Sequence, residues 1–401
     1  MNTSEKSRSK GIYFHRYLNY AASLLSKYKG EIPFHIFLKK YFSANKKHGS
    51  GDRRIITSLC YDRFRLGFAV SSSIDSNEQL LLSYFLLETK PSSFLAELKP
   101  EWNEKIELPV KEKMRIVQAL VDEEKIFPFS NELSDQIDRQ KFSCSFLDQP
   151  KLFIRIRPGF QNSVVKKLSA ANISFEKIGE ACLAFSNKEK VNEIIDIDRE
   201  AVIQDYNSQR TGDFLIRYFT KETSGISVWD CCAASGGKSI LAFDLLKDIK
   251  LTVTDTRKNI LENLKLRFLK AGIKNYESFV ADLSVPFDLP LPEFFPDLII
   301  ADVPCSGSGT WGRTPEQLSY FSKKSISRYA LLQQKIVRNA AAKLHAGGYF
   351  LYITCSVFKL ENEENVDFVQ NQLQLKLIEN KYLKGYEMQA DTLFAALFIK
   401  E

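Results

Sequence analysis

The chain has 401 residues, of which 44% are hydrophobic and 26% charged, with only 18 glycines and 13 prolines. This composition is that of a folded protein and excludes a disordered chain, a collagen and a coiled coil, while the length predicts two or three domains. The net charge of +7 is unevenly spread: residues 1–50 carry 10 Lys and Arg against 2 Asp and Glu, and residues 301–350 carry 7 against 2. Such clusters fit a polyanionic partner, either a nucleic acid or an anionic membrane, although a solvated basic face explains each cluster alone equally well.

The start of the chain, MNTSEKSRSKG, lacks the apolar region of a signal peptide, and the most apolar stretch, 80–87, is far shorter than the ~20 residues that span a bilayer. Both features indicate a cytoplasmic protein with no membrane anchor. The seven cysteines form no C-x-x-C pair and have no histidine at zinc-finger spacing. Their odd number suits a reducing compartment, so we expect neither a disulfide framework nor a bound metal.

Residues 1–140 are predicted to form a helical bundle, because their apolar residues recur at i, i+3 and i+4. The runs at 34–38, 55–64 and 80–85 show this spacing, and proline or glycine separates them. A small α/β module is expected at 145–203, with strands at 152–159 and 181–186 around a helix at 164–173.

From about residue 226 the pattern alternates between strand and helix. The strands are expected at 227–232, 251–255, 278–282, 297–302 and 349–355. The helices are expected from Gly236–Gly237 through Leu246, at 258–270 and at 326–344. Strands joined by helical crossovers predict an α/β fold with a parallel, doubly wound, Rossmann-like sheet, which we assign to residues 204–401.

The ends of these strands carry the residues on which chemistry could depend. Asp255, Asp282 and Asp302 end three predicted strands and Cys355 ends a fourth, at the edge where such sheets bind ligands. Asp255 follows Lys238 by 17 residues, close to the ~20-residue offset at which a carboxylate binds ribose hydroxyls. One strand-end Asp is more often a helix cap or turn residue, but three around one Gly-rich turn favour a cofactor that contains a nucleoside.

The Gly-rich turn consists of Cys232, Ala233, Ala234, Ser235, Gly236, Gly237 and Lys238. It resembles the phosphate loop G-x-x-x-x-G-K-[ST], but Cys232 stands where the first glycine is required, which argues against a nucleotide hydrolase. A turn of small residues without that glycine suits a cofactor with adenosine and no phosphate, such as S-adenosylmethionine. Its ribose would meet Asp255, its adenine Asp282, and its charged end the turn itself.

Two cysteines lie at this edge, Cys305 in DVPCSGSGT and Cys355 in YITCS. A buried cysteine is usually inert packing, but two at ligand-binding strand ends fit nucleophilic chemistry. Attack of a thiolate on C6 of a pyrimidine makes C5 nucleophilic enough to accept the sulfonium methyl group. Asp302 beside the ring would stabilise the adduct protonated at N3.

These motifs resemble those of the Nol/Nop/Sun RNA cytosine-5 methyltransferases, and within them the RsmB type that acts on bacterial 16S ribosomal RNA. The resemblance rests on CCAASGGKS, DVPCSGSGT and YITCSVFKLENEEN and extends over about residues 150–401. The segment HGSGDRRIITSLCYDRFR looks like the NusB-like helical RNA-binding domain of this type. The resemblance implies a class I methyltransferase domain at 204–401, an RRM-like module at 145–203 and an all-helical NusB-like domain at 1–140.

Carried over by position, the resemblance implies that Cys355 is the nucleophile, that Cys305 assists product release and that Asp302 completes the catalytic set. The cofactor S-adenosylmethionine would be bound by residues 232–238 together with Asp255, Asp282 and Asp302.

The sequence departs from the family pattern at Ser235, where proline is usual, at Val303, where alanine is usual, and at Gly312, where a second basic residue is common. The resemblance implies a monomeric enzyme that methylates RNA, with 16S ribosomal RNA as the expected substrate. The cations of 1–50 and 313–343 would contact its phosphates. Transfer RNA as substrate and a non-catalytic ribosome-assembly factor remain as alternatives.

Overall fold

The computed structural model describes residues 3–219, 225–286 and 294–401, and the chain divides into two compact units. Unit 1 comprises Met1–Ser130, Asp138–Gln149 and Trp311–Phe321. Unit 2 comprises Asn131–Ile137, Pro150–Thr310 and Ser322–Glu401. Each unit therefore contains a short segment that is separated in sequence from the rest of it. Within the described ranges, no helix combines the length and the apolar character that crossing a bilayer requires.

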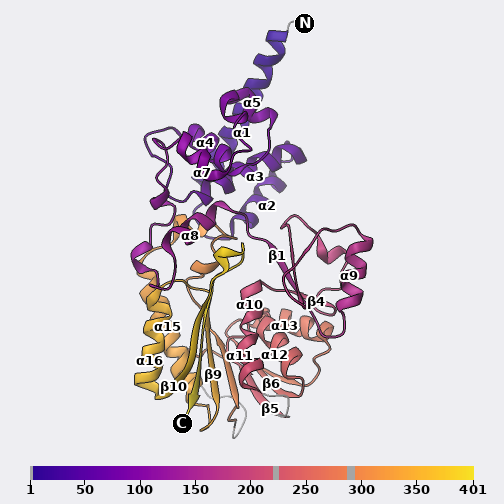
Figure 1. Cartoon of the computed structure of the whole chain (residues 1–401), viewed down its shortest axis with the longest axis vertical. Coiled ribbons are helices and arrows are strands. Elements are labelled where there is room, and N and C mark those ends of the chain that lie inside the picture. Colours follow the sequence, from indigo (N-terminus) through magenta and orange to yellow (C-terminus); the bar gives the residue numbers. More distant parts are fainter. Residues whose placement is uncertain (1–2, 220–224, 287–293) are drawn as a thin grey trace. The chain divides into compact units, whose positions relative to one another are not determined.

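Unit 1 is helical, as the spacing of apolar residues predicts. Its helices are α1 (Thr3–Lys27), α2 (Phe34–Ala44), α3 (Ser50–Arg65), α4 (Ser76–Leu87), α5 (Ser93–Leu98), α6 (Pro100–Asn103), α7 (Val110–Ile116), α8 (Arg139–Cys144) and α14 (Glu316–Tyr320). The first eight follow one another in the indigo to purple part of the chain in Figure 1, whereas α14 comes from the late segment 311–321.

The late segment 311–321 is part of the unit 1 core. The Trp311 side chain is only 2% exposed and packs against Phe127, with 6.1 Å between the ring centroids. The buried carboxylate of Glu316 accepts a hydrogen bond of 3.2 Å from the backbone amide of Phe34, at the start of α2. The unit 1 core is therefore complete only when this segment is present.

From Pro150 onward, unit 2 first forms a small antiparallel sheet in the order β2-β3-β1-β4. Its strands are β1 (Leu152–Ile156), β2 (Glu176–Lys177), β3 (Cys182–Phe185) and β4 (Ala201–Ile203), and α9 (Gln161–Ala170) lies between β1 and β2 in the chain. Ile154 and Ile156 of β1 form one buried cluster with Val164 and Leu168 of α9. We call residues 150–203 the small module.

The rest of unit 2 is a seven-stranded sheet in the order β10-β11-β9-β8-β5-β6-β7. The strands are β5 (Ile226–Asp230), β6 (Ile249–Asp255), β7 (Tyr276–Val280), β8 (Leu298–Asp302), β9 (Tyr349–Thr354), β10 (Leu375–Leu383) and β11 (Leu393–Lys400). The helices are α10 (Tyr206–Arg210), α11 (Gly212–Tyr218), α12 (Gly237–Leu246), α13 (Lys258–Ala271), α15 (Lys324–Ala341) and α16 (Glu363–Leu373). In Figure 1, α15 and α16 cover one face of the sheet and α10 to α13 the other, so the sheet is doubly wound.

The sheet is mixed, which corrects the expectation of a wholly parallel one. The strands from β9 to β7 are parallel, but β11 pairs antiparallel with both β9 and β10. β10 is an edge strand with partly exposed polar residues in its middle, so its sequence, LKLIENKYL, lacks the apolar run of a buried strand. β7 also begins and ends two residues before the strand predicted at 278–282, which leaves Asp282 beyond its end.

Candidate active site

Five parallel strands end at one edge of the sheet, in the spatial order β9, β8, β5, β6, β7. Cys355 directly follows β9, Asp302 is the last residue of β8, and Asp255 is the last residue of β6. β5 ends at Asp230 and leads into the Gly-rich turn, residues 232–238. The topology therefore places the two thiol-bearing loops side by side after β8 and β9, and the Gly-rich turn beside them after β5.

The two predicted active-site thiols meet. The Sγ atoms of Cys305 and Cys355 lie 3.1 Å apart as free cysteines, and the amide of Cys355 donates a hydrogen bond of 3.3 Å to the Cys305 sulfur. The hydrogen bond to Cys355, together with burial, raises the pKa of the Cys305 thiol well above its usual value. Cys305 therefore keeps its proton at neutral pH and can donate a hydrogen bond to the neighbouring sulfur.

One buried carboxylate joins the two thiol-bearing loops. Glu361 is fully buried, and its Oε1 accepts a hydrogen bond of 2.7 Å from the hydroxyl of Ser356, which follows Cys355. Its Oε2 accepts a hydrogen bond of 2.8 Å from the amide of Ser306, which follows Cys305. Burial raises the pKa of Glu361 above its ordinary value, although these donors oppose the effect. Glu361 lies inside the quoted motif YITCSVFKLENEEN, but nothing in the sequence separates it from the neighbouring acidic residues.

The Gly-rich turn is bonded to the end of the neighbouring strand β6. The amide of Ala234 donates a hydrogen bond of 3.0 Å to Asp255 Oδ2, and Arg257 binds the same carboxylate through its amide and guanidinium. Burial acts to raise the pKa of Asp255, but the hydrogen bonds from Arg257 outweigh it and hold the pKa below its ordinary value. Gly236 has a φ of +84°, and a Cβ there would lie 2.7 Å from the Phe268 ring, so this position requires glycine.

A salt bridge connects the Gly-rich turn to the strand that leads to Cys305. Lys238 Nζ lies 2.8 Å from Asp302 Oδ2. Burial acts to lower the pKa of Lys238, but the charge of Asp302 outweighs it and raises that pKa, so the lysine stays charged. The Asp302 side chain is still 32% exposed, which leaves it accessible to a ligand.

Asp230, at the end of β5, was missed by the sequence prediction. It is fully buried, it accepts a hydrogen bond from the hydroxyl of Ser239, and burial raises its pKa to about 7. Within the described part of the chain, its Oδ1 has no hydrogen-bond partner. The predicted strand 227–232 runs past Asp230, whereas β5 ends there, so the strand-end signal that singled out Asp255 and Asp302 would have found it only with the correct strand end.

The remaining predicted residues described here lie after β7 and at the start of the Gly-rich turn. Asp282 is exposed, and its contacts in the structure are local: the amide of Ser284 donates to its carboxylate at 2.9 Å, and hydrogen bonds from Ser284 lower its pKa. Cys232 is half-buried, and Ala233 is buried, with its amide bonded to the carbonyl of Thr254 in β6 at 2.9 Å. These placements leave the predicted roles of Asp282 and Cys232 as predictions.

Comparison with known proteins gives consistent results. The sequence model of the family described as 16S rRNA methyltransferase RsmB/F matches residues 219–395. Human tRNA (cytosine(72)-C(5))-methyltransferase NSUN6 is 31% identical over 164 residues, which are 38% of this chain and 34% of NSUN6. Ribosomal RNA small subunit methyltransferase F of Pectobacterium carotovorum is 31% identical over 147 residues, 36% of this chain and 30% of the relative. The chain thus spans about a third of the length of these curated relatives.

Solved structures show the same fold. The crystal structure of PH0851 matches 98% of both chains with a TM-score of 0.68 and 19% identity. The structure of NSun6 from Pyrococcus horikoshii with SFG matches 68% of this chain and 96% of its own, with a TM-score of 0.57 and 16% identity. The family match over residues 219–395 and the named relatives thus confirm the resemblance of this part of the chain to the Nol/Nop/Sun methyltransferases, and the solved structures show the same fold.

Proposed function

We propose that this protein transfers the methyl group of S-adenosylmethionine to C5 of a cytosine in RNA. The observation that carries the proposal is the pair of thiols of Cys305 and Cys355, 3.1 Å apart, beside the Asp302 carboxylate at the ligand-binding edge of a doubly wound sheet. A methyl transfer to a heteroatom needs no thiol, whereas transfer to C5 of a pyrimidine needs a nucleophile that adds to the ring.

In the proposed reaction, the Cys355 thiolate forms a bond to C6, and the electron pair of the C5–C6 double bond moves to C5. The carbon C5 then bonds to the methyl carbon as the bond between that carbon and the sulfonium sulfur breaks, with the electron pair left on sulfur. The proton on C5 is lost to water, the C6–S bond breaks and the double bond re-forms. Asp302 stabilises the adduct protonated at N3, and the Cys305 thiol donates a hydrogen bond to the departing Cys355 sulfur.

The residues of the Gly-rich turn fit S-adenosylmethionine. A Cβ built on Gly237 meets nothing within 4 Å, so there is open space over the start of α12. The first amides of that helix suit an anionic group such as the methionine carboxylate. The low pKa keeps Asp255 ionised, as an acceptor for ribose hydroxyls requires. The NSun6 structure similar to this one was solved with SFG, an analogue of S-adenosylmethionine.

We propose small-subunit ribosomal RNA as the substrate and the cytoplasm as the location, because the matching family model is described as a 16S rRNA methyltransferase. Transfer RNA is the second candidate, because NSUN6 is named as a tRNA methyltransferase. In this proposal residues 1–140 form the NusB-like domain, 145–203 the RRM-like module and 204–401 the catalytic domain of a monomer, with Asp282 at the adenine and Cys232 in the cofactor turn.

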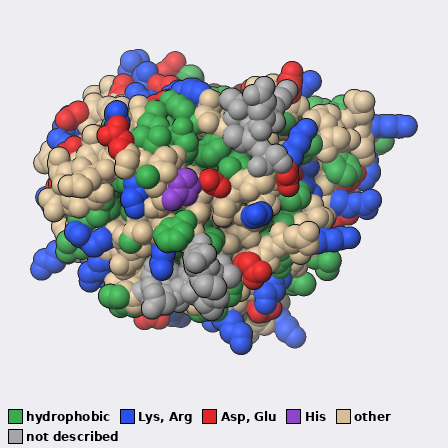
Figure 2. Space-filling view, turned by 90° about the horizontal axis from the view of Figure 1, so that it is seen from below, with side chains coloured by type: hydrophobic (Ala, Val, Ile, Leu, Met, Phe, Trp, Pro, Cys, Tyr) green, Lys and Arg blue, Asp and Glu red, His purple; other side chains and the backbone are tan. Residues whose placement is uncertain are grey.

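The RNA would bind at the edge of the sheet that carries the thiols. The opposite edge is marked by the carboxyl terminus in Figure 1, because β11 runs antiparallel to β9. Figure 2 looks at the molecule from that side, and there the described Lys and Arg side chains are interspersed with acidic and apolar ones. A mixed surface of this kind does not create the single-sign field that attracts a polyanion.

The test uses two reactions, both of which contain the protein and labelled S-adenosylmethionine. One contains unmodified small-subunit ribosomal RNA and the other unmodified transfer RNA. We expect label at C5 of a cytosine in the ribosomal RNA, located by nuclease digestion and mass spectrometry. Label in transfer RNA alone would make transfer RNA the substrate in place of ribosomal RNA. Label in neither RNA would contradict the proposed function.

Replacing Gly309 by alanine should reduce the rate of methyl transfer at least about tenfold, since a misplaced reacting group is costly even without lost contacts. The Gly309 amide donates to the Cys355 carbonyl at 2.9 Å, and a Cβ at this position would lie 1.9 Å from the carbonyl oxygen of Thr392. The backbone that carries Cys355 would therefore have to shift. Gly179→Ala is the matched control, because a Cβ there meets nothing within 4 Å. Equal rates for the two variants would show that the site tolerates this shift.

A further inference from the structure

We propose that Arg267 is a positioning residue for the cofactor turn and that the small module holds it in place through Asp198. The inference rests on the proposed function, because it concerns the binding of S-adenosylmethionine by that turn. Arg267 lies on α13 and Asp198 lies just before β4, and both are distant in sequence from the Gly-rich turn.

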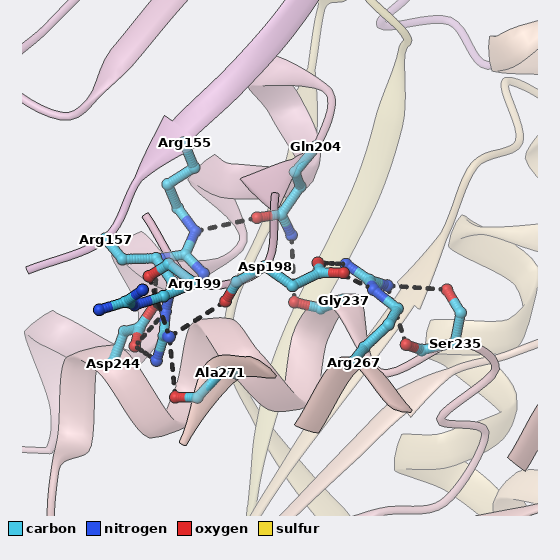
Figure 3. A network of polar contacts seen from close by, with 10 residues as sticks. All are labelled: Arg155, Arg157, Asp198, Arg199, Gln204, Ser235, Gly237, Asp244, Arg267 and Ala271. Atoms are coloured by element: carbon cyan, nitrogen blue, oxygen red, sulfur yellow. Dashed lines mark hydrogen bonds and ion pairs between the residues drawn. The ribbon is translucent and has the colours of Figure 1, made fainter. Parts of the chain in front are cut away.

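The guanidinium of Arg267 bridges the small module and the turn. Its Nη1 donates to both oxygens of Ser235, at 2.8 Å to the carbonyl and 3.0 Å to the hydroxyl. Its Nε and Nη2 donate to Asp198 Oδ1 at 2.9 and 2.8 Å, so its remaining donors are fixed by a nearly buried carboxylate. Figure 3 shows the side chain extended between these two partners. A planar guanidinium held on one side in this way presents its other donor in a fixed direction.

The turn needs such a restraint. Ala234 has a φ of +45° and Gly236 a φ of +84°, so Ser235 lies between two residues with left-handed backbone. A non-glycine residue in that region persists only where surrounding contacts fix it. The amide of Ala234 is bonded to Asp255, and Arg267 binds the next residue, so the two contacts fix the turn from both sides.

Asp198 is itself fixed. It has a φ of +72°, and its amide donates a hydrogen bond of 2.7 Å to the carbonyl of Ala201. The small module is anchored on α12, because Arg155 of β1 and Arg157, which directly follows β1, both bind Asp244 of α12, at 2.6 and 2.7 Å. Figure 3 shows these groups in one continuous network. Asp198 can therefore act as a rigid support for Arg267.

The residue that directly follows the small module also reaches the turn. Gln204, just after β4, accepts a hydrogen bond of 3.0 Å from Arg155 and donates one of 3.4 Å to the carbonyl of Gly237. Gln204, after β4, thus contacts the turn directly, and Asp198, before β4, acts on it through Arg267. Such an arrangement makes the small module part of the cofactor site without contact to the cofactor, and it predicts that weakening it changes cofactor affinity before it changes chemistry.

The test measures the affinity for S-adenosylmethionine by isothermal titration calorimetry without RNA, and the KM for the cofactor and kcat with RNA. Arg267→Met should raise the Kd and the KM for S-adenosylmethionine about tenfold, as expected for loss of hydrogen bonds to a charged group, while kcat at saturation changes less than about twofold. Asp198→Asn keeps the shape and tolerates the left-handed backbone, and it should raise the Kd in the same direction by a smaller factor. Lys265→Met, an exposed lysine on the same helix, is the matched control and should leave the Kd unchanged.

A purely structural role for Arg267 would lower the temperature of unfolding and leave the Kd of the folded variant within twofold of wild type, which would overturn the inference. If Arg267→Met does not fold, the Kd of Asp198→Asn provides the test, and a Kd equal to that of the wild type would overturn the inference. If the wild type binds S-adenosylmethionine and the variants weaken this binding, but no RNA is methylated, the proposed function fails and the positioning role stands. A wild-type protein that does not bind S-adenosylmethionine would overturn both.

Discussion

Replacing Cys355 by alanine is expected to abolish methyl transfer, and replacing Cys305 by alanine is expected to trap the protein on its RNA. Without the Cys355 sulfur nothing adds to C6, so C5 never becomes nucleophilic. Without Cys305, addition and methyl transfer proceed, but the departing sulfur loses the hydrogen bond that its neighbour offers at 3.1 Å. The adduct should therefore accumulate as a protein–RNA species that survives denaturing gel electrophoresis and disappears after nuclease treatment.

The control for this pair is Cys144→Ala, which removes a half-buried thiol from unit 1 and should leave the rate unchanged. The double variant Cys305→Ala and Cys355→Ala should form no adduct, because the sulfur that makes it is gone. Full activity of Cys355→Ala would refute its role as nucleophile, and an adduct that forms through Cys305 when Cys355 is absent would exchange the two assignments.

The second large effect is expected at Glu361, which touches neither RNA nor cofactor in the proposed reaction. Its neighbours Ser306, Ser356 and Gln333 all donate to it, at 2.7 to 2.9 Å, so only a carboxylate can accept from all three. In Glu361→Gln, an NH2 group in place of Oε2 would face two N–H donors, and one in place of Oε1 would force the Ser356 hydroxyl, which already accepts from the Phe358 amide, to reverse. Either way a bond that joins the loops carrying the two cysteines is lost or rearranged. We expect kcat to fall about 10²-fold, the scale for a misplaced reacting group, with little change in the KM for S-adenosylmethionine.

The matched control is Glu364→Gln, an exposed acidic residue at the start of α16, three positions along the chain. Circular dichroism should show that Glu361→Gln remains folded at the assay temperature, although a buried donor without an acceptor lowers its stability. The result that would contradict the positioning role is a kcat for Glu361→Gln equal to that of Glu364→Gln. A rise in the cofactor KM with unchanged kcat would also contradict it, since it would place the effect at the Gly-rich turn.

Much of the sheet could be predicted because its buried parallel strands are apolar runs. The runs that end at Asp255 and Asp302 are strands in the structure, and so is the run before Cys355. β10 could not be found in this way, because an edge strand needs no apolar run. Nor could the sequence indicate that 311–321 belongs to unit 1. That depends on contacts between residues far apart in the chain, such as Trp311 with Phe127, 184 positions away, or Glu316 with Phe34, 282 positions away.

The part of the candidate site that is formed by strand ends could be predicted from the sequence. The part formed by side chains that position other residues could not. Parallel strands end at one edge, so Cys355 and Asp302 had to lie near one another once their strands were recognised. Glu361 and Arg267 act on the site through hydrogen bonds to backbone and serine groups, and no spacing rule indicates such partners. Ser235 stands where the family usually has proline. In the structure its hydroxyl accepts a hydrogen bond from Arg267, a partner that the sequence alone could not indicate.

The membership of residues 311–321 in unit 1 has a consequence for how the protein is made. A ribosome synthesises the chain from its amino terminus, and domains generally fold in that order as they emerge. Unit 1 cannot follow this rule, because the Trp311 ring and the Glu316 carboxylate that complete its core are translated only after more than three quarters of the chain. The first 130 residues must therefore wait, with their apolar surface incompletely covered, until most of unit 2 has been translated. A chain truncated after the first 130 residues would lack Trp311 and Glu316, and its apolar surface would stay incompletely covered.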